Sequence, residues 1–376
     1  MKIPITKPYI GEEEKRAIAQ VIDSGWVSQG ERVAEFEDKF AAYSGSKYAI
    51  AFSSCTAALH SALVVSGIGQ KDEVIVPSLS FIATANAVVH SGAAPVFVDI
   101  DSKTCNIDPE KIERAITKKT KAIMSVHQMG LPADMDSIKR IADKHGLIII
   151  EDAACAVGSE YKGKRIGSHG NSACFSFHPR KIITTGEGGM VTTDNYELSE
   201  KLKRFRHHSM SISPIDRHLA RKVVIEVYPE VGYNYRLTDM QAAMGIVQLG
   251  KLPFIIEARR KIAEFYNKEF SSISCIKVPK IPGYAYHNYQ SYWIELLAGA
   301  PLSRDLLMER LLEKGIATRR GIMAIHMEEA YAGRGGKLKL PLTEKATKST
   351  LLLPIYPTMT EGEQSYIVES IKEILR

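Results

Sequence analysis

Short apolar runs and helix-like segments alternate through the first half of the chain, and this alternation most restricts the possible folds. Strands are expected at residues 48–52, 73–76, 95–100, 121–127 and 147–150, with helices between them at 53–67, 81–92, 109–116 and 134–145. The run 147–150 (LIII) is apolar throughout, which is typical of a strand buried on both faces. We therefore expect an α/β domain with a largely parallel sheet flanked by helices.

Outside this alternating region the pattern changes. Further helices are expected at residues 11–24, 31–44, 196–205, 239–252 and 257–270, and Pro253 is expected to end the fourth of them. The polar stretch 207–222 predicts a mobile loop. From about residue 276 the expected strands and helices are short, which indicates a smaller α+β domain. We expect a large domain over residues 1–252 and a small C-terminal domain over residues 253–376.

One lysine stands between two expected strands. Residues 173–193 read ACFSFHPRKIITTGEGGMVTT and place Lys181 in a polar turn, followed by the glycine cluster at 186–189. An amine in this position could form a Schiff base with an aldehyde. Because most lysines are surface residues, an ordinary solvated Lys181 stays open from spacing alone.

Polar residues follow several of the expected strands, and ligands of such sheets sit beyond the carboxyl ends of the strands. Residues 53–56 (SSCT) form a strand-to-helix turn suited to a phosphate, although an ordinary helix cap explains them equally well. Asp152 follows a buried strand and needs a positive or donating partner, either a protonated pyridine nitrogen or a neighbouring Lys or Arg. Together with Lys181, a phosphate site and a pyridinium partner describe a site for pyridoxal phosphate.

The chain resembles the DegT/StrS-type sugar aminotransferases, a family of fold-type-I enzymes that depend on pyridoxal phosphate (PLP). The resemblance covers nearly the whole chain and rests on the segments GWVSQG, TAAL, PSLSFIATANAV, EDAACAVGS, SFHPRKIITTGEGG, GYNYRLTDMQAAMG and GIATRRGIMAIH. It implies transfer of an amino group from an amino acid, most simply L-glutamate, through pyridoxamine phosphate to a keto sugar. A nucleotide-linked 4-keto-6-deoxyhexose is the implied acceptor, in the biosynthesis of amino sugars for lipopolysaccharide, cell wall or antibiotics.

The resemblance also implies roles for individual residues. Lys181 holds the cofactor and moves the proton, and Asp152 faces the ring nitrogen. Contacts to the phosphate and to the ring are implied for Thr56, Ala57, Ser176 and Phe81. Two positions depart from the family pattern, since Cys155 replaces a glutamine near the phenolic oxygen and Cys55 replaces the glycine before Thr56.

The resemblance implies roles for three further residues, one at the partner subunit and two at the substrate. Asn234 matches a residue that reaches the phosphate in the neighbouring subunit, so a homodimer with shared sites is expected. Arg320 and His326 lie in the stretch that lines the substrate end in the family.

Other functions stay open beside transamination. A dehydratase of the same family uses pyridoxamine phosphate and carries His where this chain has Lys181, so that Lys181 favours transamination. A regulatory protein would bind the cofactor without turnover, but regulation needs no lysine that moves protons. A NAD-dependent sugar dehydrogenase shares the α/β pattern, but the sequence lacks the glycine fingerprint of that class.

Composition narrows the partners and the compartment. The net charge is +6 over 376 residues, with basic and acidic residues interspersed, which indicates no nucleic-acid partner but suits an anionic substrate. The five cysteines are far apart and form no metal-binding pair, so free thiols in a reducing compartment and no metal are expected. No apolar run resembles a signal peptide or a membrane span, and we expect a cytoplasmic protein without a membrane partner.

Overall fold

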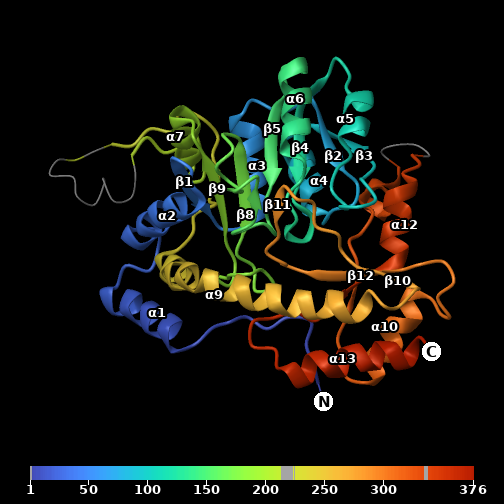
Figure 1. Ribbon diagram of the computed structural model, residues 1–376. Helices are drawn as coiled ribbons and strands as arrows, with labels where there is room; N and C mark the ends of the chain where they lie inside the picture. Colours follow the sequence, from blue (N-terminus) through green and yellow to red (C-terminus); the bar gives the residue numbers. More distant parts are fainter. Residues whose placement is uncertain (1, 213–222, 224, 334–337) are drawn as a thin grey trace.

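The computed structural model describes residues 2–212, 223, 225–333 and 338–376 (Figure 1). Its main sheet has seven strands in the order β1-β9-β8-β5-β4-β2-β3. These strands are β1 (Tyr48–Phe52), β2 (Glu73–Pro77), β3 (Ala94–Val98), β4 (Thr120–Val126), β5 (Ile148–Asp152), β8 (Ser172–Ser176) and β9 (Gly189–Thr193). Neighbours from β3 to β8 pair in parallel, and β9 alone runs antiparallel to β8 and β1. The expected largely parallel sheet is therefore confirmed.

Helices cover both faces of this sheet, as the apolar strands predict. They are α2 (Glu31–Ser44), α3 (Cys55–Val65), α4 (Ala83–His90), α5 (Pro109–Ala115), α6 (Met135–His145) and α7 (Tyr196–Phe205), and α1 (Glu12–Ser24) precedes them in the chain. Side chains alternate along each strand, so Val74 and Val76 of β2 join the core under α3, α4 and α7. Ile75 joins the opposite core, which α2, α5 and α6 complete.

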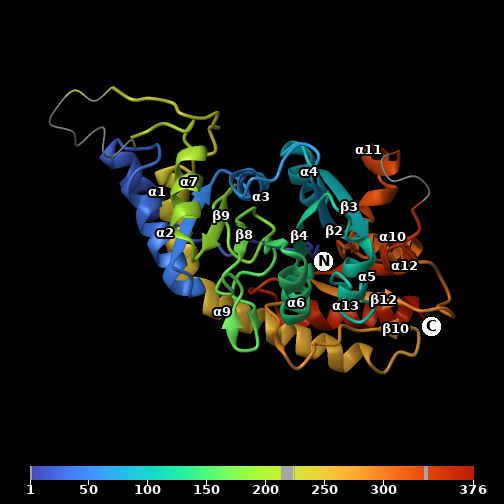
Figure 2. The same ribbon diagram turned by 90° about the horizontal axis from the view of Figure 1, so that it is seen from above.

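Helix α9 (Asp239–Phe270) runs without interruption through Pro253, so the expectation that Pro253 ends a helix is wrong. Proline has no N–H and forfeits one backbone hydrogen bond, at a cost of about 3 kcal/mol. The residues around it are Leu252, Ile255 and Ile256, which are all buried in the core of the main sheet. Burial of three such side chains contributes about 1.5–3 kcal/mol each, which offsets that cost. Figure 2 shows α1 and α2 beside this helix, and both pack against it.

The C-terminal part has a sheet and a core of its own. Four strands pair in the order β10-β12-β14-β13, namely β10 (Ile276–Lys277), β12 (Tyr292–Leu296), β14 (Thr350–Leu353) and β13 (Arg319–Arg320). Around them lie α10 (Arg304–Glu313), α12 (Pro341–Ser349) and α13 (Glu361–Ile374), whereas α11 (Glu329–Ala332) packs through Tyr331 on a core of the main sheet. Their core takes in the second half of α9, from Ile262 to Phe270, and also Ile3. The expected domain boundary at residues 252 and 253 thus falls within α9.

Smaller elements complete the described chain. A third sheet joins β11 (Ala285–Tyr286), β6 (Glu160–Tyr161) and β7 (Lys164–Arg165), and single 3-10 turns lie at Gln128–Gly130 and Ile325–Met327. Most of the loop expected at 207–222 lies outside the described residues. Within the described residues, no helix combines the length and apolar character needed to cross a bilayer.

Candidate active site

A cavity of about 470 Å³ lies at the carboxyl ends of the parallel strands. Residues that follow or end β1, β2, β4, β5 and β8 line one side, and residues 319–323 and 352–355 of the C-terminal part line the other. Eight residues singled out in the sequence line this one cavity, namely Cys55, Thr56, Phe81, Asp152, Cys155, Ser176, Lys181 and Arg320. The convergence expected at the strand ends is therefore present.

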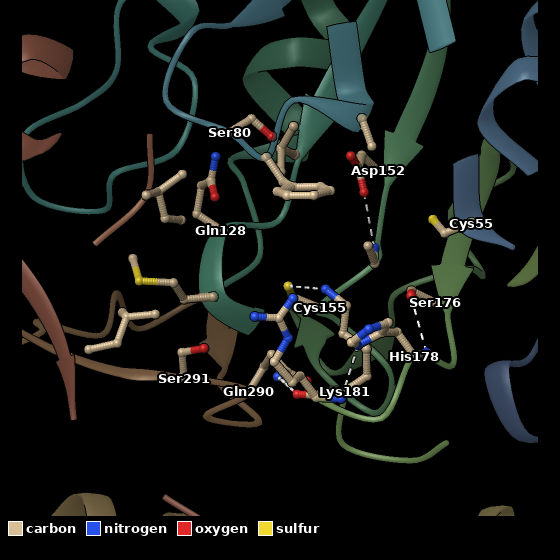
Figure 3. A pocket seen from close by; sticks show the side chains of 18 of the residues that line it. Cys55, Ser80, Gln128, Asp152, Cys155, Ser176, His178, Lys181, Gln290 and Ser291 are labelled. Carbon is tan, nitrogen blue, oxygen red and sulfur yellow. Dashed lines mark hydrogen bonds between the residues drawn. The ribbon is translucent and has the colours of Figure 1, made fainter. Parts of the chain in front are cut away.

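Lys181 projects into the cavity from the turn between β8 and β9 (Figure 3). The turn is closed by a hydrogen bond from the backbone N–H of Lys181 to the carbonyl of His178, at 2.8 Å. The amine donates to the sulfur of Cys155, at a distance of 3.1 Å. Burial acts to lower the pKa of the Lys181 amine, but the contact with Cys155 and the nearby Asp152 together leave that pKa above its usual value. Lys181 is thus not an ordinary solvated lysine.

Asp152 ends β5 at the same cavity and is 6% exposed. Its Oδ2 accepts from the hydroxyl of Thr84 at 2.7 Å, and Oδ1 accepts from the backbone N–H of Ala154 at 3.2 Å. Ser80 extends the network through its hydroxyl, 2.7 Å from that of Thr84. Within the described ranges no Lys or Arg forms a salt bridge with Asp152, so the salt-bridge alternative from the sequence is not realised.

The neighbouring acid, Glu151, points the other way, as alternation along a strand requires. It is fully buried and contacts His127 Nε2 at 2.8 Å and the amide of Asn171 at 3.0 Å. Burial acts to raise the pKa of Glu151, but His127, His169 and Asn171 together outweigh burial and lower it. Two adjacent carboxyl groups therefore have separate surroundings, and only Asp152 faces the cavity.

The N-terminus of α3 supplies the third part of the cavity wall. Ser54 caps this helix by accepting from the N–H of Ala57, at 3.1 Å, so the ordinary cap left open by the sequence is present. Ser54, Cys55 and Thr56 also line the cavity, whereas Ala57 does not. The first N–H groups of a helix have no intrahelical acceptor and attract anions. Burial, with the nearby Asp152, raises the pKa of the Cys55 thiol well above its usual value and keeps that thiol neutral.

Gly189 permits the close contact between β9 and this helix end. A Cβ atom on Gly189 would lie 2.5 Å from the carbonyl carbon of Ser54 and 2.6 Å from the amide nitrogen of Cys55. Both are backbone atoms that cannot move aside, so any larger residue would push β9 and α3 apart. Gly189, the last glycine of the cluster noted in the sequence, thus allows β9 to lie close to the N-terminus of α3.

The remaining predicted residues occupy different places. Phe81 lines the cavity and is 63% exposed, and Ser176 lines it at the end of β8. Arg320 lines it too and forms a 3.2 Å salt bridge with Glu328. His326 is held away from the lining, with Nδ1 2.6 Å from the hydroxyl of Ser78. Asn234 is exposed, forms a β-bridge with His207, and does not line the cavity of its own chain.

Several lining or supporting residues were not anticipated from the sequence. They are Thr84, which fixes Asp152, and the lining residues Gln128, His178, Arg180 and Gln290. Arg180 directly precedes Lys181 in the sequence, and this position could have predicted that it lines the site. Thr84 and Gln290 carried none, because only the fold brings them to the site. Within the described residues no group of His, Cys, Asp and Glu forms a metal site.

The sequence profile of the DegT/DnrJ/EryC1/StrS aminotransferase family matches residues 8–372. The chain belongs to this family. It is 38% identical over 379 residues to SpsC of Bacillus subtilis (strain 168), a spore coat polysaccharide biosynthesis protein, covering 100% of this chain and 97% of SpsC. The family resemblance inferred from the sequence is thereby confirmed.

Solved structures of other proteins share this fold over the whole chain. PseC of Helicobacter pylori, an aminotransferase involved in the biosynthesis of pseudoaminic acid, has a TM-score of 0.93 at 30% identity, covering 100% of this chain and 99% of PseC. Spr1654 of Streptococcus pneumoniae, solved in a PLP form, has a TM-score of 0.92 at 28% identity, covering 100% of this chain and 98% of that one. The protein is accordingly a PLP-dependent sugar aminotransferase.

The residues around the cavity fit this cofactor. The cavity offers an amine, a buried carboxylate that pairs with no described cation, and a helix N-terminus with small hydroxyls. These are the three partners that an aldehyde, a pyridinium and a phosphate require. All three belong to one cavity.

Proposed function

We propose that Lys181 binds the cofactor and moves the proton, and that Asp152 keeps the ring nitrogen protonated. When bound, PLP supplies an aldehyde that carries the amino group and a ring that takes up electrons from the reacting carbon. Thr56 and Ser176 receive the phosphate, Ala57 supports them through the helix cap, and Phe81 stacks on the ring. The presence of Lys181 and Asp152 in one cavity carries this proposal.

The freed amine of Lys181 is the group that takes a proton from the donor's α-carbon and returns it to the cofactor. Thr84 and the N–H of Ala154 both donate to Asp152 and so hold its carboxyl group in position beside the ring. The sulfur of Cys155 accepts from Lys181 and so fixes the direction of the amine before the cofactor arrives.

We further infer that the donor is L-glutamate and that the acceptor is a nucleotide-linked 4-keto-6-deoxyhexose. The names of SpsC and PseC support a role in making amino sugars for surface polysaccharides or related glycans. The arginines at positions 180, 319 and 320 in the cavity wall suit substrates that carry carboxylates and a diphosphate. Lys181 supports transamination over dehydration, and the complete set of cofactor partners supports turnover over regulation alone.

A homodimer with shared active sites is the assembly we propose. Asn234 is exposed and lies outside its own cavity, as expected for a residue that serves the site of the partner subunit. Residues 225–231, which precede Asn234, extend away from the body (Figures 1 and 2). They expose apolar side chains at Ile225, Val227, Tyr228 and Val231. Such a surface is suited to burial against a second copy.

Two further proposals complete this account. The separate cores support a large domain that ends within α9 and a small C-terminal domain. The five cysteines are free, which supports residence in the reducing cytoplasm.

The test uses purified protein loaded with PLP. We expect a yellow protein whose absorbance is bleached by L-glutamate, followed by conversion of one member of a panel of nucleotide-linked keto sugars, read by mass spectrometry. Bleaching without conversion of any 4-keto-6-deoxyhexose would contradict the proposed acceptor. A yellow protein that no amino donor bleaches would favour the regulatory alternative.

A further inference from the structure

Arg180 is a cation in the cavity wall whose side chain has no partner in the described part of the chain. It lines the cavity directly before Lys181 and is exposed to it. Its hydrogen bonds involve only its backbone, and no salt bridge to it is formed by any described acid. Arg320 in the same wall differs, because Glu328 neutralises it at 3.2 Å.

The backbone of Arg180 is nevertheless held firmly. Its N–H donates to Nδ1 of His178 at 3.2 Å, and its carbonyl accepts from Nε2 of Gln290 at 2.7 Å. Gln290 is itself 8% exposed and is fixed by Asn288, whose Oδ1 accepts from the N–H of Gln290 at 2.8 Å, and by Arg259, which donates to its carbonyl at 3.1 Å. The backbone from which the Arg180 side chain extends is thus held in place.

The cavity also contains an unsatisfied acceptor beside this turn. Oε1 of Gln290 is buried and has no hydrogen-bond partner among the described residues, while Gln290 lines the cavity. A buried amide oxygen without a donor costs about 1–3 kcal/mol unless a ligand satisfies it. The guanidinium of Arg180 suits an anionic group of a ligand, whereas the amide oxygen of Gln290 suits a donor such as an ammonium group.

Two described acids line the cavity, Asp152 and Glu187, and neither pairs with the guanidinium of Arg180. Asp152 already accepts a hydrogen bond from the hydroxyl of Thr84, and Oε1 of Glu187 lies 3.9 Å from Nε2 of His178. Within the described ranges neither acid forms a salt bridge with Arg180, so the positive charge of Arg180 is available to a ligand.

We propose that Arg180 binds the α-carboxylate of the amino-acid donor, an inference that rests on the proposed aminotransferase function. The donor's carboxylate is attached to the same carbon from which Lys181 takes the proton, so its binding group must lie next to Lys181. The diphosphate of a nucleotide-linked sugar is separated from its reacting carbon by the sugar ring and reaches a more distant part of the wall. A guanidinium also matches a carboxylate through two parallel hydrogen bonds.

The experiment follows the donor half-reaction alone, as the single-turnover bleaching of PLP-loaded protein by L-glutamate. For Arg180→Gln we expect the half-saturating glutamate concentration to rise roughly 10- to 100-fold. Arg180→Lys keeps the charge but not the paired geometry and should fall between this variant and the wild type. Arg310→Gln removes an exposed arginine on α10 that does not line the cavity, and it should match the wild type.

A second comparison identifies the group that Arg180 contacts. Isoglutamine is glutamate with the α-carboxylate converted to an amide, and glutamine has the side-chain carboxylate converted instead. The wild type should prefer glutamate over isoglutamine by roughly 10- to 100-fold, and Arg180→Gln should lose most of that preference while keeping any preference over glutamine. A lost preference over glutamine alone, or an effect confined to the sugar half-reaction, would overturn the inference.

The result also separates this inference from the function on which it rests. If glutamate bleaches the wild type and Arg180→Gln equally well, the inference fails and the proposed function stands. If another α-amino acid is the donor, the same comparison is made with that amino acid and its α-amide, because the α-carboxylate is common to all. If Arg180→Gln does not retain PLP, Arg180→Lys decides, and an unchanged half-saturating concentration in it would contradict the inference. If no α-amino acid bleaches the wild type, both proposals fail.

Discussion

The amine nitrogen of Lys181 lies 3.1 Å from the sulfur of Cys155. The sulfur stabilises the ammonium form, which raises the pKa of Lys181 although burial acts to lower it. An amine must lose its proton before it attacks an aldehyde, so we expect this contact to slow capture of the cofactor at neutral pH.

Replacement of this sulfur gives the first prediction. In Cys155→Ala the pKa of Lys181 should fall, and the rate of PLP capture by the cofactor-free protein should reach its half-maximum at a lower pH. Capture at pH 7 should therefore be faster than in the wild type, as measured by stopped-flow absorbance. Cys275→Ala, which changes a thiol away from the cavity, is the control. An unchanged or higher midpoint in Cys155→Ala would show that the sulfur does not hold the ammonium.

Gly189→Ala tests the close approach of β9 to the N-terminus of α3. The added methyl would lie 2.5 Å from the backbone of Ser54, so we expect a loss of roughly 1–3 kcal/mol in the free energy of unfolding and weaker binding of PLP. Gly250→Ala is matched to it, since a Cβ there has no neighbour within 4 Å and Ala favours a helix by about 1 kcal/mol. Urea unfolding and PLP titration measure both effects. Equal stabilities of the two variants would refute the steric argument.

Thr84→Val tests the hydrogen bond that orients Asp152. The hydroxyl is fully buried and donates to Oδ2 at 2.7 Å, so its loss leaves one carboxylate oxygen without a donor, at a cost of about 1–3 kcal/mol. We expect kcat to fall about tenfold if most of this cost appears in the transition state. Thr84→Ser keeps the hydroxyl and should retain most of the activity. Equal loss in both variants would mean that packing, not the hydrogen bond, is responsible.

Mixing two inactive variants tests whether the active site is shared. Lys181→Ala lacks the proposed base, and Asn234→Ala lacks the proposed contact to the phosphate of the partner subunit. A mixed dimer has one site that contains both Lys181 from one chain and Asn234 from the other, so unfolding and refolding the two variants together should restore part of the activity. Light scattering should show dimers throughout. Full activity of Asn234→Ala on its own would remove the basis for a shared site.

The sequence was sufficient to predict the parallel sheet, because each strand from 48–52 to 147–150 carries its own apolar signal. It could not predict that β9 alone runs antiparallel, because the apolar pattern of a strand does not show in which direction the strand runs within the sheet. Pro253 was misleading because its local preference is weaker than the burial of Leu252, Ile255 and Ile256 around it.

The site residues that directly follow an expected strand were predictable from the sequence. Lys181, Asp152 and the turn before α3 each follow a strand, and the sheet necessarily brings strand ends together. Gln290 and Thr84 contact this set through the tertiary fold and have no sequence pattern of their own. His326 was expected at the substrate end, but its bond to Ser78 places it outside the cavity lining.

The central claim is that the amine of Lys181 forms the covalent link to PLP. Borohydride reduction of PLP-loaded protein, followed by peptide mass spectrometry, tests it most directly. We predict that the reduced cofactor is attached to Lys181 and that Lys181→Ala shows no attachment while still binding PLP through the phosphate site. Attachment to a different lysine in the wild type, or trapping that persists in Lys181→Ala, would contradict the account.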